Sequence, residues 1–148
     1  MKPLTAIYLG ALLSLCVFAG IIQMTDTADY RIMHIDPASG LPIYTANNSF
    51  IAATPCFENT VQINNIGFHG PFVPLEKGKD VFRILIIGSS YIEARQVPVI
   101  EMYSTLLQNE LNANPHRAYM YEVIPMGVNT NTLFTTALYY VEYGSALK

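Results

Sequence analysis

The sequence contains no tryptophan and only two cysteines, and charged residues make up just 13% of its 148 residues. Eight basic residues face eleven acidic ones, the formal net charge is −3, and no basic run occurs. Nucleic acid is therefore not expected as a partner, because binding its phosphates depends on clustered positive charge. The three histidines, His34, His69 and His116, are too scattered to form a metal site, so neither a metal nor another cofactor is expected.

The chain is rich in apolar residues, and many of them lie at the N-terminus. Hydrophobic residues make up 51% of the chain, too many for a disordered protein, and the length suits one ordinary domain. The stretch Leu4–Ile22 holds no charged residue, and about 20 such residues cross a bilayer as a helix. Lys2 precedes it, and the next basic residue is Arg31. The positive-inside bias therefore predicts a cytoplasmic N-terminus, with everything after Met24 outside.

Two interpretations of this segment remain open. One is an uncleaved signal anchor, and the other is a secretory signal peptide with Val17 and Ala19 as the small residues before a cut at Gly20. The anchor is favoured because apolar residues continue through Ile22 and because few charges precede the segment. A buried helix at the start of a soluble domain is the third and least favoured interpretation.

The two cysteines are not expected to pair with each other. Cys16 lies inside the apolar segment and Cys56 beyond it, so a membrane-spanning segment would hold them apart. Cys56 is then a lone thiol in an oxidising compartment or pairs with another chain. The favoured interpretation is simpler, namely that Cys56 is a small, half-buried apolar residue.

The rest of the chain divides by its pattern into a linker and an α/β part. Residues 25–80 show no helical periodicity, and "IDPASGLPIY" and "VQINNIGFHGPFVP" predict turns and short strands. From residue 81, the run "VFRILIIG" is typical of a strand buried on both faces of a parallel sheet, and "YEVIPMG" predicts a second strand. The expected organisation is therefore 1–24 as signal anchor or signal peptide, 25–80 as extracytoplasmic linker, and 81–148 as the α/β part.

Two helices are predicted in this last part. The first lies between the strands and must end near Asn114, because Pro115 cannot continue it. The second comes after the second strand, with Asn or Thr at its start and Gly144 at its end. Their apolar stripes are expected at Val99, Tyr103, Leu106, Leu107 and Leu111 in the first helix, and at Leu133, Phe134, Ala137, Leu138 and Val141 in the second.

The order strand, helix, strand, helix predicts an α/β fold with parallel strands and right-handed crossovers. Two strands are too few for such a sheet, which usually has about five. One sheet edge and much of both helices' apolar faces are then expected to lack cover. We therefore expect the chain to fold poorly alone, and a protein partner that covers the incomplete sheet is one possible interpretation.

The turn Gly88-Ser89-Ser90 joins the first strand to a short helical stretch and suits a nucleophile. Glycine permits a sharp turn, and the next residues lie where free backbone N–H groups and a helix dipole favour negative charge. A serine there can attack a carbonyl while its own N–H stabilises the oxyanion, provided a base lies within hydrogen-bond reach. The alternative is a helix N-cap, for which serine is equally suited. The elbow pattern of α/β-hydrolases is not met, because Ile92 replaces its second glycine.

The stretch "FRILIIGSSYIEARQVP" resembles the first block of the SGNH/GDSL hydrolases, an apolar strand followed by Gly-Asp-Ser-aromatic. Ser90 matches the nucleophile of that block, and Ser89 stands where the family usually has Asp. The upstream "INNIGFHGPFVPLEKGKD" is similar to an extension of membrane-anchored members, with His69 in place of the usual Arg. The run "YEVIPMGVNTNT" resembles the second block, whose glycine, matched by Gly127, lends an N–H to the oxyanion hole. The resemblance implies a flavodoxin-like fold, of which this chain is the N-terminal portion.

The resemblance stops before the family's remaining blocks. No Gly-x-Asn-Asp and no Asp-x-x-His occurs in the sequence, so the third oxyanion donor, the base and its orienting carboxylate are missing. His34 and His69 precede the first strand, and His116 is expected in a solvated loop at the end opposite the site. Glu93 and Arg95 come just after the turn and can pair with each other or touch a substrate, but exposed charges are the favoured interpretation.

The activity that the resemblance implies is that of a serine ester hydrolase or O-acyl transferase acting outside the cytoplasm on an acylated small molecule or carbohydrate. Ser90 would be the nucleophile, the N–H groups of Ser90 and Gly127 would hold the oxyanion, and Gly88 and Ser89 would shape the turn. The chain is expected to be truncated and inactive as it stands. The alternative is a non-catalytic, membrane-anchored remnant or assembly subunit. Cleavage of the signal would make the protein secreted.

Overall fold

A computed structural model describes residues 10, 12–17, 32–129 and 131–147 of the chain. The chain divides into two compact units, Met1–Tyr30 and Arg31–Lys148. In the first unit Gly10 and residues 12–17 are helical, and most of the expected anchor Leu4–Ile22 lies outside the described residues. Among the residues that are described, none belongs to a helix long and apolar enough to cross a membrane.

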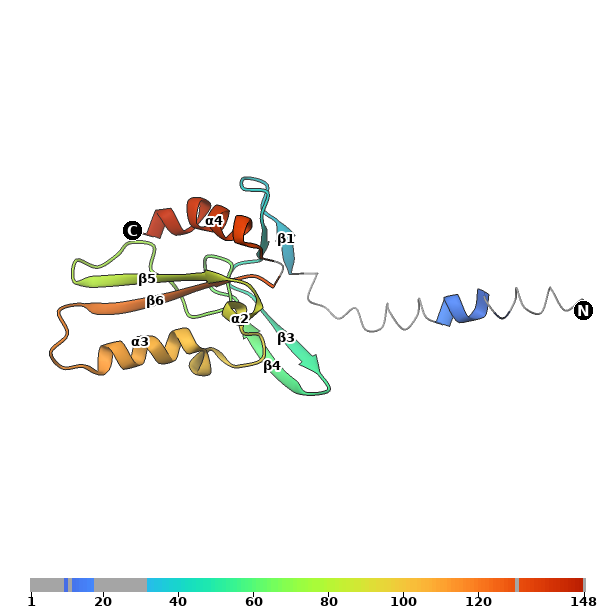
Figure 1. Ribbon diagram of the computed structural model, residues 1–148, viewed down its shortest axis with the longest axis horizontal. Helices are drawn as coiled ribbons and strands as arrows, with labels where there is room; N and C mark the ends of the chain where they lie inside the picture. The colour runs from blue at the N-terminus through green and yellow to red at the C-terminus, as the bar shows by residue number, and fades with distance from the viewer. Residues whose placement is uncertain (1–9, 11, 18–31, 130, 148) are drawn as a thin grey trace, which may run out of the picture. The chain divides into compact units, whose positions relative to one another are not determined.

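The second unit is a mixed α/β structure with one short parallel sheet and two small antiparallel ones (Figure 1). Its strands are β1 (Met33–Ile35), β2 (Pro42–Tyr44), β3 (Ser49–Thr54), β4 (Phe57–Gln62), β5 (Val81–Gly88) and β6 (Met120–Gly127). Its helices are α2 (Ser90–Glu93), α3 (Tyr103–Ala113) and α4 (Leu133–Glu142), with short 3₁₀ turns η2 (Val99–Glu101) and η3 (Gly144–Leu147). These bounds confirm the predicted alternation of strand and helix from residue 81 onward.

Two antiparallel hairpins, β1–β2 and β3–β4, precede the parallel sheet. The β1–β2 turn is closed by Asp36, whose carboxylate accepts hydrogen bonds from Ser39 and from the hydroxyl of Tyr143, at 2.6 and 2.7 Å. These two hydrogen bonds lower the pKa of Asp36 to about 2. Because Tyr143 directly follows α4, the same carboxylate ties the first hairpin to the end of that helix.

The parallel pair β5–β6 is the centre of the unit, and its register sets Gly88 directly opposite Gly127. Figure 1 shows α4 and α3 on opposite sides of the pair. Helix α3 packs mainly on β6, whereas α4 packs on β5. Thr132 caps the start of α4 through its side chain, as a Thr cap was predicted to do.

The expectation that β5 is buried on both faces is wrong. None of its residues is fully buried, and the side chain of Phe82 is 50% exposed. The expected apolar stripes of the helices are also largely in solvent, with Leu106 of α3 54% exposed and Phe134 of α4 73% exposed. The residues that are buried next to these stripes are Met102 before α3, Ser104 within α3 and Tyr139 within α4. In the described part of the chain β5 pairs only with β6, and only α2 and α4 pack on it, which leaves much of the strand and of the helices' expected stripes in solvent.

The main core joins the hairpin region to the parallel sheet. Leu41, Ile43 and Phe68 pack in one buried cluster with Met126 of β6 and Tyr139 of α4. The ring of Phe68 meets that of Tyr139 edge to face, with centroids 5.7 Å apart. Residues from the segment predicted as a linker therefore supply part of the hydrophobic core that supports β6.

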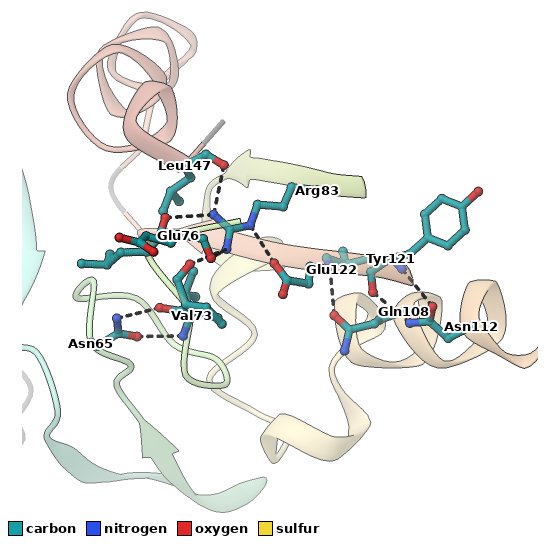
Figure 2. A network of polar contacts seen from close by, with 12 residues as sticks. Asn65, Val73, Glu76, Arg83, Gln108, Asn112, Tyr121, Glu122 and Leu147 are labelled. Carbon is teal, nitrogen blue, oxygen red and sulfur yellow. Dashed lines mark hydrogen bonds and ion pairs between the residues drawn. The ribbon is translucent and has the colours of Figure 1, made fainter. Parts of the chain in front are cut away.

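A buried arginine holds the start of the parallel sheet together (Figure 2). The side chain of Arg83 is 4% exposed, and its Nε lies 2.6 Å from the Glu122 carboxylate on β6. Its two terminal nitrogens donate to backbone carbonyls of the preceding loop and of the last turn, namely those of Pro74, Leu75, Glu76 and Leu147. A guanidinium suits this position because its fixed fork of donors can satisfy several acceptors at once.

Candidate active site

The turn after β5 places Ser90 at the carboxyl end of the parallel sheet. Ser90 is the first residue of α2 and is half-buried, and Ser89 is the N-cap residue. The Ser89 side chain makes no capping hydrogen bond. A Cβ on Gly88 would lie 2.5 Å from a side-chain carbon of Ile92, so the chain can turn back this tightly only because residue 88 has no side chain.

Helix α2 is a single turn, too short for the helix dipole that was expected at this site. It ends at Ala94, which takes a left-handed conformation with φ 49° and donates its N–H to the Ser90 carbonyl. The dipole of one turn is small, because the macrodipole is a sum over many aligned peptides. The turn therefore offers an anion its unpaired backbone N–H groups rather than a helix dipole.

Gly127 presents its N–H away from β5. The N–H of Val128 donates to the Gly88 carbonyl at 3.1 Å, and neighbouring residues of a strand direct their N–H groups to opposite sides. The N–H of Gly127 thus lies outside the β5–β6 ladder, at the same sheet end as Ser90. No hydrogen bond joins it to another residue in the described part of the chain.

The Cα of Gly127 lies directly against the backbone of α2. A Cβ at residue 127 would come within 2.1 Å of the Glu93 nitrogen and 2.5 Å of the Ile92 carbonyl carbon. Both are backbone atoms that cannot rotate out of the way. Only glycine at position 127 therefore lets β6 support the turn that carries Ser90.

Glu93 is buried, which corrects the expectation that it is an exposed charge. Its side chain is enclosed below the turn, and the residue is 1% exposed. Its carboxylate accepts a hydrogen bond from the Tyr44 hydroxyl at 2.5 Å and one from Arg95 Nε at 3.0 Å. The predicted pairing with Arg95 is thus confirmed. The backbone of Asn129 also acts on this carboxyl and lowers its pKa, so one carboxylate interacts with β2, α2 and the loop after β6.

Burial is the main cause of the pKa shifts of Glu93 and His69. Loss of solvent raises the pKa of Glu93, and the hydrogen bonds from Tyr44 and Arg95 only partly oppose that effect. His69 lies next to it, 1% exposed, with Nδ1 2.7 Å from the Glu93 carbonyl oxygen. Burial lowers the pKa of His69, so the ring is held neutral with Nδ1–H as the donor. Its other nitrogen, Nε2, is buried without a hydrogen-bond partner in the described structure.

The side chains of two asparagines donate hydrogen bonds to backbone carbonyls on either side of the turn that carries Ser90. Asn131 donates from Nδ2 to the Gly88 carbonyl at 3.1 Å. Asn59 of β4 donates to the carbonyls of Arg95 and Val97, at 3.0 and 2.8 Å. The segment after Ser90 is therefore held by the β3–β4 hairpin, which lies far before it in the sequence.

None of the three histidines is hydrogen-bonded to Ser90. His34 is exposed on β1, and His116 is exposed in the loop before β6, which confirms its predicted solvated position. His69 points a nitrogen at the Glu93 backbone instead. No hydrogen bond joins the Ser90 hydroxyl to any other described residue, and no group of acidic, histidine or cysteine side chains among them could hold a metal. Within the described residues, the turn therefore carries a serine hydroxyl that is not hydrogen-bonded to a base.

Ser90 and Gly127, which the sequence predicts as site residues, lie at the same end of the sheet, but the residues that support the turn were not predicted. Tyr44, Asn59 and His69 all come from the segment predicted as a linker, and no local pattern marks them as partners of the turn. The one available signal was the position of His69 in "NNIGFHG", where a glycine-bearing loop precedes the first parallel strand. Cys56, expected to be half-buried, is exposed in the turn between β3 and β4 and forms no disulfide.

Comparison of the chain with known proteins does not assign it to a family. No protein-family model matches the chain. No curated protein matches it either.

Proposed function

We propose that this chain is the nucleophile-bearing part of a serine ester hydrolase or acyl transferase of the SGNH/GDSL type. In this proposal the parallel pair β5–β6 belongs to a flavodoxin-like sheet. The N-terminal apolar segment anchors the protein, and the site faces the outside of the cytoplasm. The substrate class is an acylated small molecule or carbohydrate.

One observation carries the proposal, the pairing of Gly88 with Gly127 in the β5–β6 register. It sets Gly127, whose N–H the ladder does not use, at the same end of the sheet as the turn that bears Ser90. A hydroxyl next to free backbone donors at the carboxyl ends of parallel strands is the arrangement that acyl transfer requires.

The chemistry assigned to these groups is addition followed by elimination. Ser90 Oγ would bond to the acyl carbon while its proton passes to a base, and the carbonyl oxygen would take the negative charge. The N–H groups of Ser90 and Gly127 would hold that oxyanion until the alcohol leaves with a proton. Water or an acceptor hydroxyl would then release the acyl group from Ser90. The base must come from a polypeptide segment other than the described residues, because none of their imidazoles is hydrogen-bonded to Ser90.

A non-catalytic role in assembly is the second candidate, and the missing base favours it. Chemical rescue separates the two. Hydrolysis of p-nitrophenyl acetate by the full chain is measured with and without added imidazole, beside Ser90→Ala and the neighbouring control Ser89→Ala. The proposal predicts imidazole-dependent turnover that Ser90→Ala removes and Ser89→Ala retains. Equal rates for the wild type and Ser90→Ala in imidazole, with all chains folded, would favour the non-catalytic role.

A further inference from the structure

The carbonyl of Gly88 joins the end of β5 to the loop that follows β6. It accepts two hydrogen bonds, one from the backbone N–H of Val128 and one from Nδ2 of Asn131, each at 3.1 Å. Gly88 is the last residue of β5 and pairs with Gly127, the last residue of β6. The two hydrogen bonds therefore hold the ends of the parallel strands together on the side of the sheet where Ser90 lies.

This carbonyl belongs to the peptide unit that opens the turn. The carbonyl of Gly88 and the N–H of Ser89 lie in one plane and point in opposite directions, because the peptide is planar and trans. One donor leaves such a plane free to rotate about the direction of its hydrogen bond, and a second donor restricts that rotation. Ser90 follows directly, as the first residue of α2. The direction in which Ser90 leaves the sheet therefore depends on both donors.

Asn131 can donate to Gly88 in only one orientation of its side-chain amide. A carbonyl oxygen can only accept, so the amide NH₂ group must face Gly88 and Oδ1 must face away from it. Oδ1 then accepts a hydrogen bond from the hydroxyl of Thr135. The Thr135 oxygen itself accepts from the backbone N–H of Thr132 at 2.7 Å. A hydroxyl can accept and donate at once, so Thr135 selects the amide orientation that Gly88 requires.

The cap of α4 holds Thr135 in place for this contact. The side chain of Thr132 accepts from the Thr135 N–H at 3.2 Å, and the Thr132 N–H donates back to the Thr135 hydroxyl, which makes a reciprocal capping box. The Thr135 hydroxyl also lies 3.1 Å from the Thr132 carbonyl, a second acceptor on the same turn. A chain of hydrogen bonds thus runs from the start of α4 through Thr135 and Asn131 to Gly88.

We propose that Asn131 is a positioning residue, which sets the relative position of the two N–H groups assigned to the oxyanion. This inference rests on the proposed function, in which those groups belong to Ser90 after β5 and to Gly127 at the end of β6. Their separation depends on the bonds between the two strand ends, and Asn131 supplies one of these bonds to Gly88. Oxyanion donors act only when both lie about 2.7–3.1 Å from the developing charge. Asn131 acts through the Gly88 carbonyl, without touching the substrate.

Four variants of the full chain separate this role from a general effect on α4. Asn131→Ala removes the donor to Gly88, and Thr135→Val removes the hydroxyl that orients it. Thr135→Ser is the conservative variant, because it retains the hydroxyl. Thr136→Val is the matched control, because the neighbouring Thr136 hydroxyl donates to the Thr132 carbonyl at 2.8 Å, within α4.

Amide NMR spectra of the ¹⁵N-labelled chains give the first test, and they need no activity. The signals of Ser89 and Ser90 should move in Asn131→Ala and in Thr135→Val, because the peptide before them loses a restraint. They should keep their wild-type positions in Thr135→Ser and Thr136→Val. Unchanged Ser89 and Ser90 signals in Asn131→Ala would overturn the proposal. Equal changes in Thr135→Val and Thr136→Val would overturn it too, because the effect would then come from the helix as a whole.

Hydrolysis of p-nitrophenyl acetate in added imidazole gives the second test. Asn131→Ala and Thr135→Val should lower kcat on the order of tenfold, the effect of about one hydrogen bond. KM should not change, because the oxyanion forms only in the transition state. Thr135→Ser should keep the wild-type kcat, and a raised KM with an unchanged kcat in Asn131→Ala would contradict the proposal. If the wild type shows no imidazole-dependent turnover, the proposed function fails, and the amide signals still decide whether Asn131 positions the turn.

Discussion

The backbone of Glu93 rests directly on Gly127, so close that a single methyl group on Gly127 would come within 2.1 Å of the Glu93 nitrogen. This contact joins the end of β6 to the turn after β5. It makes the position of Ser90 depend on the absence of a side chain on the neighbouring strand.

We predict that Gly127→Ala lowers the free energy of unfolding by about 3 kcal/mol, since overpacking against rigid atoms costs about 1–3 kcal/mol or more. Urea denaturation measures the loss. Gly78→Ala is the control, because a Cβ there meets only a flexible side-chain carbon of Val81 at 3.0 Å. Equal stability of the two variants would show that α2 moves aside easily.

We predict that Glu93 gives the protein a pH-dependent stability. Its pKa is raised above the ordinary 4.5 in the folded chain, so the folded state holds the proton more tightly than the unfolded state. The free energy of unfolding contributed by this group is therefore full below about pH 4.5 and falls as the pH rises through the folded pKa. Denaturation at several pH values should show a shallower decline in Glu93→Gln. Glu101→Gln, on an exposed residue, should retain the slope of the wild type.

The full chain alone should show no hydrolysis of p-nitrophenyl acetate above a Ser90→Ala control. The Ser90 hydroxyl has no hydrogen bond to a base within the described structure, and serine is a weak nucleophile without one. Initial rates at neutral pH with matched protein concentrations measure the difference. Clear Ser90-dependent turnover without any addition would contradict this prediction.

We predict that Arg83→Lys destabilises the unit by about 2–3 kcal/mol, the cost of losing hydrogen bonds from a charged donor. An ammonium group retains the charge opposite Glu122, but it cannot reach the carbonyls of both the preceding loop and Leu147. Thermal unfolding compares this variant with Arg117→Lys, an exposed arginine whose hydrogen bonds go to Met120 and to the Asn114 carbonyl of its own loop. Similar melting temperatures would mean that the charge alone suffices.

The elements that the sequence predicted well are those set by local pattern. The run from Val81 to Gly88 is a strand as expected, and Pro115 and Thr132 mark helix ends because their backbone chemistry acts within one turn. Burial was predicted poorly, since it depends on the neighbours that lie beside an element. Leu106 fits the periodicity of a buried stripe yet faces solvent, and Glu93 was expected as a surface charge yet is enclosed.

In the candidate site, too, some residues could be predicted from local pattern and others could not. That Ser90 and Gly127 lie at the same end of the sheet could be predicted, because each follows or ends an apolar strand and parallel strands end together. Tyr44, Asn59 and His69 could not, because they reach the turn through tertiary packing of hairpins whose sequences carry no periodic signal. Their contacts are visible only once the chain is folded.

Through Asn59, the β3–β4 hairpin holds the backbone that follows the turn carrying Ser90. Ala94 is held at φ 49°, a conformation that costs a non-glycine residue about 1 kcal/mol or more. The hydrogen bonds from Asn59 to the Arg95 and Val97 carbonyls lie immediately after it. The hairpin thus restrains the backbone just after Ala94, the residue in the left-handed conformation that ends the turn begun by Ser90. The conformation of the turn that carries Ser90 then depends on a part of the chain that lies far from it in sequence.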